Sequence, residues 1–184
     1  MNLNNFFNPS SIAIVGASSD KNKVGYAVMA NLSLGVASRK LFPISIDESE
    51  ILGHKAYKSI KEISENIDLA VIAVRADIVP NIMRDCAEKK IGNVIIISAG
   101  FKEMNEAGAK LEEEVAKIAR ENNIALLGPN CLGIIDTHTN FNASFAPSTP
   151  PKGHTAFISQ SGALGTAILD KAISTNIGFS KFIS

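Results

Sequence analysis

Short apolar runs recur along the chain, and segments with helical periodicity separate them. Several runs are apolar at nearly every position instead of alternating with polar residues, which is typical of strands buried on both faces. The runs expected to form strands are residues 12–15, 40–46, 69–74, 93–98 and 124–127. Because strands and helices alternate with short connections, the sequence predicts an α/β protein with a doubly wound parallel sheet and right-handed crossovers.

The first apolar run ends in a turn of small residues that leads into a helix. The turn is Gly16-Ala17-Ser18-Ser19, and Gly25 follows at the start of the helix expected over residues 24–34. The first four amides of a helix have no acceptor within it and carry about half a positive charge. We therefore predict that residues 16–25 cradle the diphosphate of a nucleotide-like ligand, and that a side chain at Gly16 obstructs it. The alternative is an ordinary tight turn, because the glycine spacing is not the standard dinucleotide-binding one.

Small residues and turn formers also follow the later strands. In doubly wound sheets, ligands bind at the carboxyl ends of the strands, so we assign the residues found there to the same binding site. These residues are Val74, Arg75, Ser98, Ala99, Gly100 and Asn130.

The composition argues against several classes of function. Among the 184 residues, eighteen basic ones balance eighteen acidic ones, so the charge indicates neither a nucleic-acid partner nor an anionic membrane. No apolar run approaches the roughly 20 residues that a membrane-spanning helix needs. Cys86 and Cys131 lie far apart and the three histidines are scattered, which predicts neither a disulfide nor a metal site and suits a reducing cytoplasm.

The composition changes near residue 136. Thr, Asn, Ser and Pro dominate residues 136–152, which we interpret as a linker. Over residues 153–184 we expect a strand, a Ser-Gln-Ser-Gly turn, a helix and a second strand. One βαβ unit does not make a domain, so we predict one ligand-binding domain over residues 1–135 and an incomplete second α/β unit after the linker.

The motifs and their order resemble those of the ADP-forming acyl-CoA synthetases and the alpha subunit of succinyl-CoA synthetase. The most specific segments are Ser98-Ala99-Gly100-Phe101-Lys102-Glu103, Gly128-Pro129-Asn130-Cys131-Leu132-Gly133 and Ser159-Gln160-Ser161-Gly162-Ala163-Leu164. This resemblance covers nearly the whole chain. It implies a Rossmann-like coenzyme A-binding domain followed by the start of a flavodoxin-like domain, both belonging to an acid–thiol ligase.

The resemblance also implies a reaction. In that family the thiol of coenzyme A takes an acyl group from an acyl phosphate, and the phosphoryl group travels through a phosphohistidine to ADP. Carried over here, Ser161 and Gly162 donate backbone amides to the phosphoryl group, and the phosphohistidine lies beyond Ser184. His54, His138 and His154 do not occupy its motif and are interpreted as loop or surface residues. The chain is then expected to bind coenzyme A without turning over alone, since ATP, ADP and Mg bind through domains absent from it.

Two departures from the family pattern concern the charged ends of the ligand. The family commonly has a Pro-Val-Asn-Pro-Lys-like segment after the second strand, whereas this chain has Pro43-Ile44-Ser45-Ile46-Asp47-Glu48. Lys40 or Lys55 is then a candidate partner for the 3′-phosphate of coenzyme A. Arg75 stands where the family often has a proline, and it either meets a phosphate or is solvated.

Other functions and roles stay open on the sequence. An acidic residue such as Asp47, near the end of the second strand, is what a dinucleotide site uses for a ribose hydroxyl. An NAD(H)-binding oxidoreductase or redox sensor is therefore one alternative, and a non-catalytic coenzyme A-sensing module is another.

We interpret Cys131 as a packing residue, and Glu103 as either a helix-start residue or a group near the thiol of coenzyme A. A partner subunit, further C-terminal domains or a homo-oligomer would complete the second unit.

Overall fold

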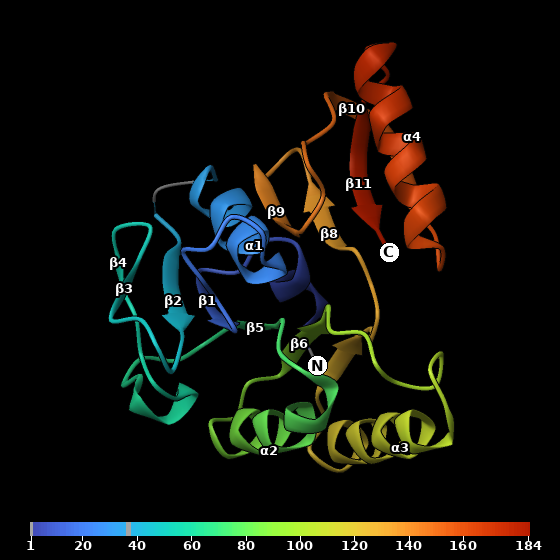
Figure 1. Ribbon diagram of the computed structural model, residues 1–184. Coiled ribbons are helices and arrows are strands. Elements are labelled where there is room, and N and C mark those ends of the chain that lie inside the picture. The colour runs from blue at the N-terminus through green and yellow to red at the C-terminus, as the bar shows by residue number, and fades with distance from the viewer. Residues whose placement is uncertain (1, 36–37) are drawn as a thin grey trace.

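The larger sheet of the computed structural model, which describes residues 2–35 and 38–184, has five parallel strands (Figure 1). They are β1 (Ser11–Val15), β2 (Lys40–Ile44), β5 (Leu69–Ile72), β6 (Asn93–Ile96) and β7 (Ala125–Leu127). Their order in the sheet is β2-β1-β5-β6-β7, so the chain reverses its direction of winding between β1 and β5. This order confirms the predicted doubly wound α/β fold, a fold in which ligands generally bind outside the carboxyl ends of the strands where the winding reverses.

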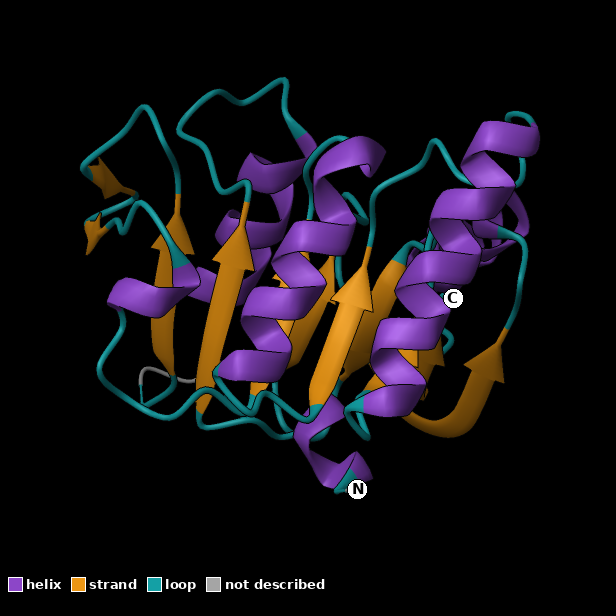
Figure 2. Ribbon diagram, turned by 90° about the horizontal axis from the view of Figure 1, so that it is seen from below, coloured by secondary structure: helices purple, strands orange, loops and turns teal. Residues whose placement is uncertain are grey.

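Helices cover both faces of this sheet because alternate strand residues point to opposite sides. On one face, α1 (Val24–Ser33) packs Val28, Met29 and Leu32 against Ile12 and Ile14 of β1. On the other face lie α2 (Val79–Glu88) and α3 (Glu106–Glu121), which Figure 2 shows across the front of the strands. The two hydrophobic layers explain why the strands are apolar at nearly every position.

A second sheet of four strands follows in the chain. Its order is β10-β11-β8-β9, formed by β8 (Gly133–Asp136), β9 (Phe141–Ser144), β10 (Lys152–Ile158) and β11 (Phe179–Ile183). Strands β10 and β11 are parallel and are connected through α4 (Gly162–Ser174), as predicted, whereas β8 pairs antiparallel with β11. The stretch that we interpreted as a plain linker therefore contains β9 and joins the sheet of the unit that follows it.

Shorter elements complete the chain. They are η1 (Leu3–Phe6), β3 (Glu50–Ile51), β4 (His54–Lys55), η2 (Ile60–Glu62) and η3 (Ala76–Ile78). The residues around Gly53 turn a small hairpin between β3 and β4. Asp77 lies in η3, which continues directly into α2. Pro43 lies in β2 at the edge of the sheet, where a missing amide is tolerated.

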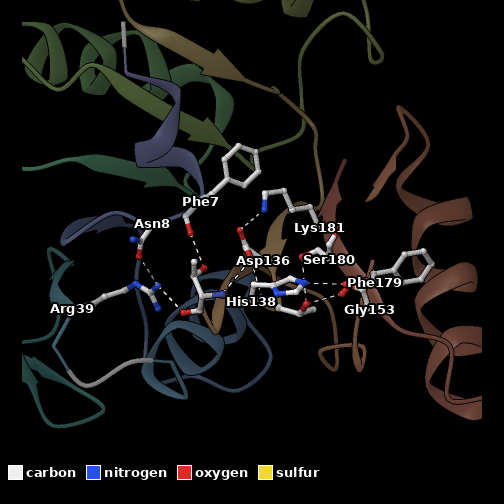
Figure 3. Close-up of polar contacts among 11 residues, drawn as sticks. Phe7, Asn8, Arg39, Asp136, His138, Gly153, Phe179, Ser180 and Lys181 are labelled. Carbon is white, nitrogen blue, oxygen red and sulfur yellow. Dashed lines mark hydrogen bonds and ion pairs between the residues drawn. The ribbon is translucent and has the colours of Figure 1, made fainter. Parts of the chain in front are cut away.

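Polar contacts of Asp136 hold the turn between β8 and β9, and Arg39, which precedes β2, joins this turn to the large sheet (Figure 3). The Asp136 carboxylate is 2 % exposed, lies 2.8 Å from Lys181 Nζ, and accepts the backbone amides of His138 at 2.9 Å and Thr139 at 3.2 Å. Arg39 donates to the carbonyl oxygens of Thr139 and Asn140 at 2.8 and 2.9 Å. We call Asp136, Lys181, Arg39 and the turn over residues 137–140 the inter-sheet joint.

Candidate functional site

A cavity of about 580 Å³ lies where the carboxyl ends of β5 and β6 meet the start of α4. Its lining comes from the strand ends of the large sheet, from the segments flanking β8 and β9, and from the Ser-Gln-Ser-Gly turn. The lining residues are Val24, Ala73, Val74, Arg75, Ile97, Ser98, Ala99, Asn130, Cys131, Leu132, Phe145, Gln160, Gly162 and Ala163. The fold thus brings five predicted cofactor-binding residues and one predicted phosphoryl-binding residue to one cavity.

The two glycines of the first loop serve close packing. Gly16 has a φ of +87°, a conformation that favours glycine, and a Cβ there would collide with the carbonyl oxygen of Ala73. A Cβ on Gly25 would collide with the carbonyl oxygen of Gly16. A substitution at Gly16 therefore also disturbs the protein's own backbone, so a loss of binding in such a variant would not by itself report obstruction of the ligand.

In the rest of the first loop, Ser18 and Ser19 both contact the carboxylate of Glu48. Ala17 and Ser18 are buried, whereas Ser19 is exposed. The hydroxyl of Ser18 accepts a hydrogen bond from the amide of Asp20 and donates one to Glu48, each at 3.1 Å. The amide of Ser19 donates to the same Glu48 carboxylate at 3.0 and 3.2 Å. A carboxylate of the protein thus already accepts the amide of this exposed loop residue.

Hydrogen bonds fasten the other strand ends to one another. The hydroxyl of Ser98 accepts the amide of Val74 at 3.1 Å, and the carbonyl oxygen of Ser98 accepts the amide of Asn130 at 2.9 Å. Asn130 has a φ of +54°, in the left-handed region that asparagine tolerates. These bonds fix the cavity wall formed by the ends of β5, β6 and β7.

Arg75 lines the cavity at its exposed side. Its Nε and Nη2 atoms donate to the two carboxylate oxygens of Asp77 at 3.1 and 2.8 Å, and its side chain is 80 % exposed. Arg75 is therefore a solvated cation with a bidentate partner, and a ligand phosphate would have to compete with Asp77 for it.

Glu103 binds the loop that follows β6. Its carboxylate accepts the amides of Gly100 at 2.6 Å and Phe101 at 3.2 Å. Burial would raise the pKa of Glu103, but the hydrogen bond from Gly100 and its companions hold it below its ordinary value. The helix itself begins at Glu106 and is capped by Asn105, so the interpretation of Glu103 as a helix-start residue was wrong.

Glu103 also lines a second cavity, of about 480 Å³. This cavity shares Asn130, Cys131 and Gln160 with the first one, so these three residues form the wall between the two spaces. Such adjacent cavities can hold different ends of a long ligand.

The Ser-Gln-Ser-Gly turn delivers the start of α4 to the cavity. Ser161 is the N-cap, and its hydroxyl accepts the amide of Leu164 at 3.3 Å. Gly162 and Ala163, whose amides belong to the first turn and have no helical acceptor, line the cavity. This geometry provides backbone donors and a positive helix end for an anionic group.

Cys131 does not have the properties of a reactive thiol. Its Sγ atom contacts the carbonyl oxygen of Ile96 at 3.3 Å, and burial raises the pKa of the thiol to about 12. A thiol in that state is almost entirely protonated at neutral pH. The interpretation of Cys131 as a packing residue is confirmed.

The structure separates the two lysine candidates for a ligand phosphate. Lys40 begins β2 and pairs in register with Ser11, so it lies at the amino edge of the sheet, opposite the cavity. This position excludes Lys40 as a contact at the carboxyl ends of the strands. Lys55 lies in β4 with its Nζ atom 5.2 Å from the centre of the Tyr57 ring.

Sequence reasoning missed two residues that line the first cavity. Gln160 belongs to the recognised turn but was not assigned a role, and it lines both cavities. Phe145 lies in the stretch interpreted as a linker, where a large aromatic residue among polar ones was the available signal.

Residues 2–35 and 38–184 lack two further features, a metal-binding cluster and a membrane-spanning helix. This part of the chain contains no group of three or more His, Cys, Asp or Glu side chains arranged to hold a metal ion. None of its helices combines the length and the hydropathy that a bilayer crossing requires.

Comparison with known proteins gives consistent matches along the whole chain. Residues 10–137 match the family described as CoA binding domain, and residues 152–184 match the succinyl-CoA ligase like flavodoxin domain. The chain is 48 % identical over 182 residues to the acetate–CoA ligase [ADP-forming] II subunit alpha of Pyrococcus furiosus, covering 99 % of this chain and 39 % of that protein. It is 42 % identical over 178 residues to the 4-hydroxybutyrate–CoA ligase [ADP-forming] of Nitrosopumilus maritimus, covering 96 % of this chain and 25 % of that protein.

A solved structure shares the arrangement of both units. The acetyl-coenzyme A synthetase 1 of Ca. Korarchaeum cryptofilum, solved in complex with phosphate and ADP, superposes with a TM-score of 0.93 at 38 % identity. The match covers 100 % of this chain and 39 % of that one, so the chain spans well under half the length of these relatives. The chain belongs to the CoA binding domain family and is homologous to the corresponding portion of ADP-forming acyl-CoA synthetases.

Proposed function

We propose that this chain is the coenzyme A-binding portion of an ADP-forming acyl-CoA synthetase. The observation that carries the proposal is that the strand ends of the large sheet and Gly162 at the start of α4 line the same cavity. Coenzyme A lies with its diphosphate near Ser19 and its pantetheine arm directed into this cavity. Its thiol then meets the acyl group beside the amides of α4.

Different residues of the cavity contact different parts of the ligands in this proposal. The backbone around Val74, Ala99 and Asn130 shapes the channel for the pantetheine arm, and the apolar side chains of Val24 and Leu132 exclude water. The amides of Gly162 and Ala163, together with the helix dipole, stabilise the negative charge of a phosphoryl group. These donors are held in place before the ligand arrives, because the Ser161 cap fixes the first turn of α4.

Parts of the enzyme outside these 184 residues supply the remaining chemistry in this proposal. The carrier histidine is one of them, since His54, His138 and His154 line neither of the two cavities described above. ATP, ADP and Mg bind elsewhere, and a partner subunit or further domains complete the active site. The match to only 39 % of the length of the Pyrococcus relative supports this division.

Titration calorimetry tests the proposal. We expect coenzyme A to bind more tightly than NAD, which removes the dinucleotide alternative. Dephospho-coenzyme A then measures the contribution of the 3′-phosphate. Tighter binding of NAD than of coenzyme A would overturn the proposal.

A further inference from the structure

The carboxylate of Glu48 occupies the anion-binding face of the first loop. It accepts the amide of Ser19 at 3.0 and 3.2 Å and the hydroxyl of Ser18 at 3.1 Å. Glu48 lies 29 positions further along the chain than Ser19, so the fold, and not local sequence, brings the two together. An amide that already donates to a carboxylate is not available to a phosphate oxygen.

The segment that carries Glu48 is itself held beside the loop. The amide of Glu48 donates to the hydroxyl of Ser45 at 3.3 Å. Lys58 Nζ donates to the carbonyl oxygens of Ile46 at 2.8 Å and Glu48 at 3.3 Å. These contacts fix the backbone of residues 45–48, so the Glu48 side chain meets the loop from a defined position.

Glu48 is negatively charged in this arrangement. Hydrogen bonds from Ser19 are the largest cause that holds the pKa of Glu48 below its ordinary value, and the charge of nearby Lys23 acts in the same direction. Two anions cannot share one exposed amide, and at such short range they repel each other. The arrival of a diphosphate therefore requires the Glu48 side chain to swing away.

We propose that Glu48 is an intramolecular competitor for the diphosphate of the ligand and sets the affinity of the first loop for it. This inference rests on the proposed function and adds a residue that weakens binding. The hydrogen bond from the Ser19 amide to the Glu48 carboxylate breaks before or during ligand binding. The freed carboxylate then moves into solvent, because its side chain lies at the surface.

Two substitutions test this competition. Glu48→Ala removes the competing group, and Glu48→Gln removes its charge while keeping its shape. We expect Glu48→Ala to bind coenzyme A about fivefold more tightly than the wild type, the size expected when ligand binding no longer has to break the net hydrogen-bonded contact between Glu48 and Ser19. Glu48→Gln should show a smaller gain, since its amide oxygen can still accept from Ser19.

Shortened ligands and a control variant test whether the gain in affinity of Glu48→Ala arises at the diphosphate. The gain should be equal for coenzyme A and dephospho-coenzyme A and absent for pantetheine, which has no diphosphate. Asp47→Asn changes the charge equally at the neighbouring exposed position and should alter the affinity less than twofold. In ¹⁵N spectra, the amide of Ser19 should shift in ligand-free Glu48→Ala and shift again on addition of coenzyme A.

The outcomes separate this inference from the proposed function. If the wild type binds coenzyme A and Glu48→Ala binds it equally or more weakly, Glu48 is not a competitor, although the proposed function stands. An equal gain in Asp47→Asn, or a gain for pantetheine, also overturns the competition. If neither the wild type nor Glu48→Ala binds coenzyme A, the proposed function fails and the inference fails with it.

Discussion

Replacing Asp136 by asparagine tests how firmly the inter-sheet joint holds the second sheet. Asparagine keeps an oxygen that can accept the amides of His138 and Thr139 but loses the ion pair with Lys181. The Asp136 side chain is 2 % exposed and that of Lys181 is 37 % exposed. The burial of this ion pair is thus intermediate. Exposed pairs contribute about 0–1 kcal/mol to stability, and breaking a buried pair costs about 3–5 kcal/mol. We therefore expect Asp136→Asn to lower the free energy of unfolding by about 2 kcal/mol.

Two further variants separate the contribution of the backbone hydrogen bonds of Asp136 from that of its ion pair with Lys181. Asp136→Ala also removes the acceptor for both backbone amides, which raises the expected loss to about 4 kcal/mol. Lys181→Met keeps the aliphatic stem but leaves the carboxylate without its cation. In a double-mutant cycle, Asp136→Asn and Lys181→Met should together cost less than the sum of the single losses, by about 1 kcal/mol.

The effect of Asp136→Asn should depend on pH. Burial would raise the pKa of Asp136, but hydrogen bonds from Lys181, Thr139 and His138 outweigh it and hold that pKa below its ordinary value. A carboxyl group with a lowered pKa in the folded state stabilises the protein above its unfolded pKa of about 3.9, and this stabilisation is lost as the pH falls through the folded pKa. The difference between wild type and variant should therefore be constant from about pH 5 to 8 and should shrink below about pH 4.

Urea unfolding followed by circular dichroism measures these free energies, and hydrogen exchange shows where they act. Faster exchange in Asp136→Asn should be confined to β8, β10, β11 and α4, while β1 and β5 keep the protection of the wild type. A loss below 0.5 kcal/mol at pH 7, or a difference that persists unchanged at pH 3, would refute this account of the joint.

Three other predictions concern single positions. Cys131 should resist alkylation by iodoacetamide at pH 8 in the native protein and react fully in urea, because burial raises its thiol pKa to about 12; rapid native modification would contradict this. Ser161→Ala should cost about 1 kcal/mol in urea unfolding through loss of the α4 cap, whereas Ser174→Ala, at the other end of the helix, should cost less; equal losses would show that the cap is unimportant. Gly108→Ala should destabilise the protein by at least about 1 kcal/mol, although alanine normally favours a helix, because its Cβ would collide with the carbonyl oxygen of Phe101; a gain in stability would contradict this packing.

The large sheet could be predicted from the sequence because its strands carry a local signal. Residues such as Ile12 and Val71 belong to runs buried on both faces, and small residues mark the ends of these runs. Strand β9 carries no such signal, because Asn142 and Ser144 are polar and find hydrogen-bond partners only once the chain is folded. Asn142 Oδ1 accepts the amide and the hydroxyl of Ser144, and the carbonyl oxygen of Ser144 accepts from Asn31 of α1. A buried strand of this kind resembles a loop in composition.

The position of the candidate site could also be predicted from the sequence, but its side-chain contacts could not. Strand ends and helix starts locate it, because backbone geometry follows from the fold class. The acids that already bind its loop amides were not predictable in the same way. Glu48 reaches Ser19 through a tertiary contact, and Glu103 turns back to Gly100 instead of starting a helix. Side-chain contacts of this kind depend on loop paths that periodicity does not encode.

A crystal structure of the chain with coenzyme A tests the central claim most directly. We predict that the diphosphate lies beside the amide of Ser19, with Glu48 displaced, and that the thiol lies in the cavity within reach of Gly162. A ligand bound with its diphosphate remote from residues 16–25, or with its thiol outside that cavity, would contradict the account.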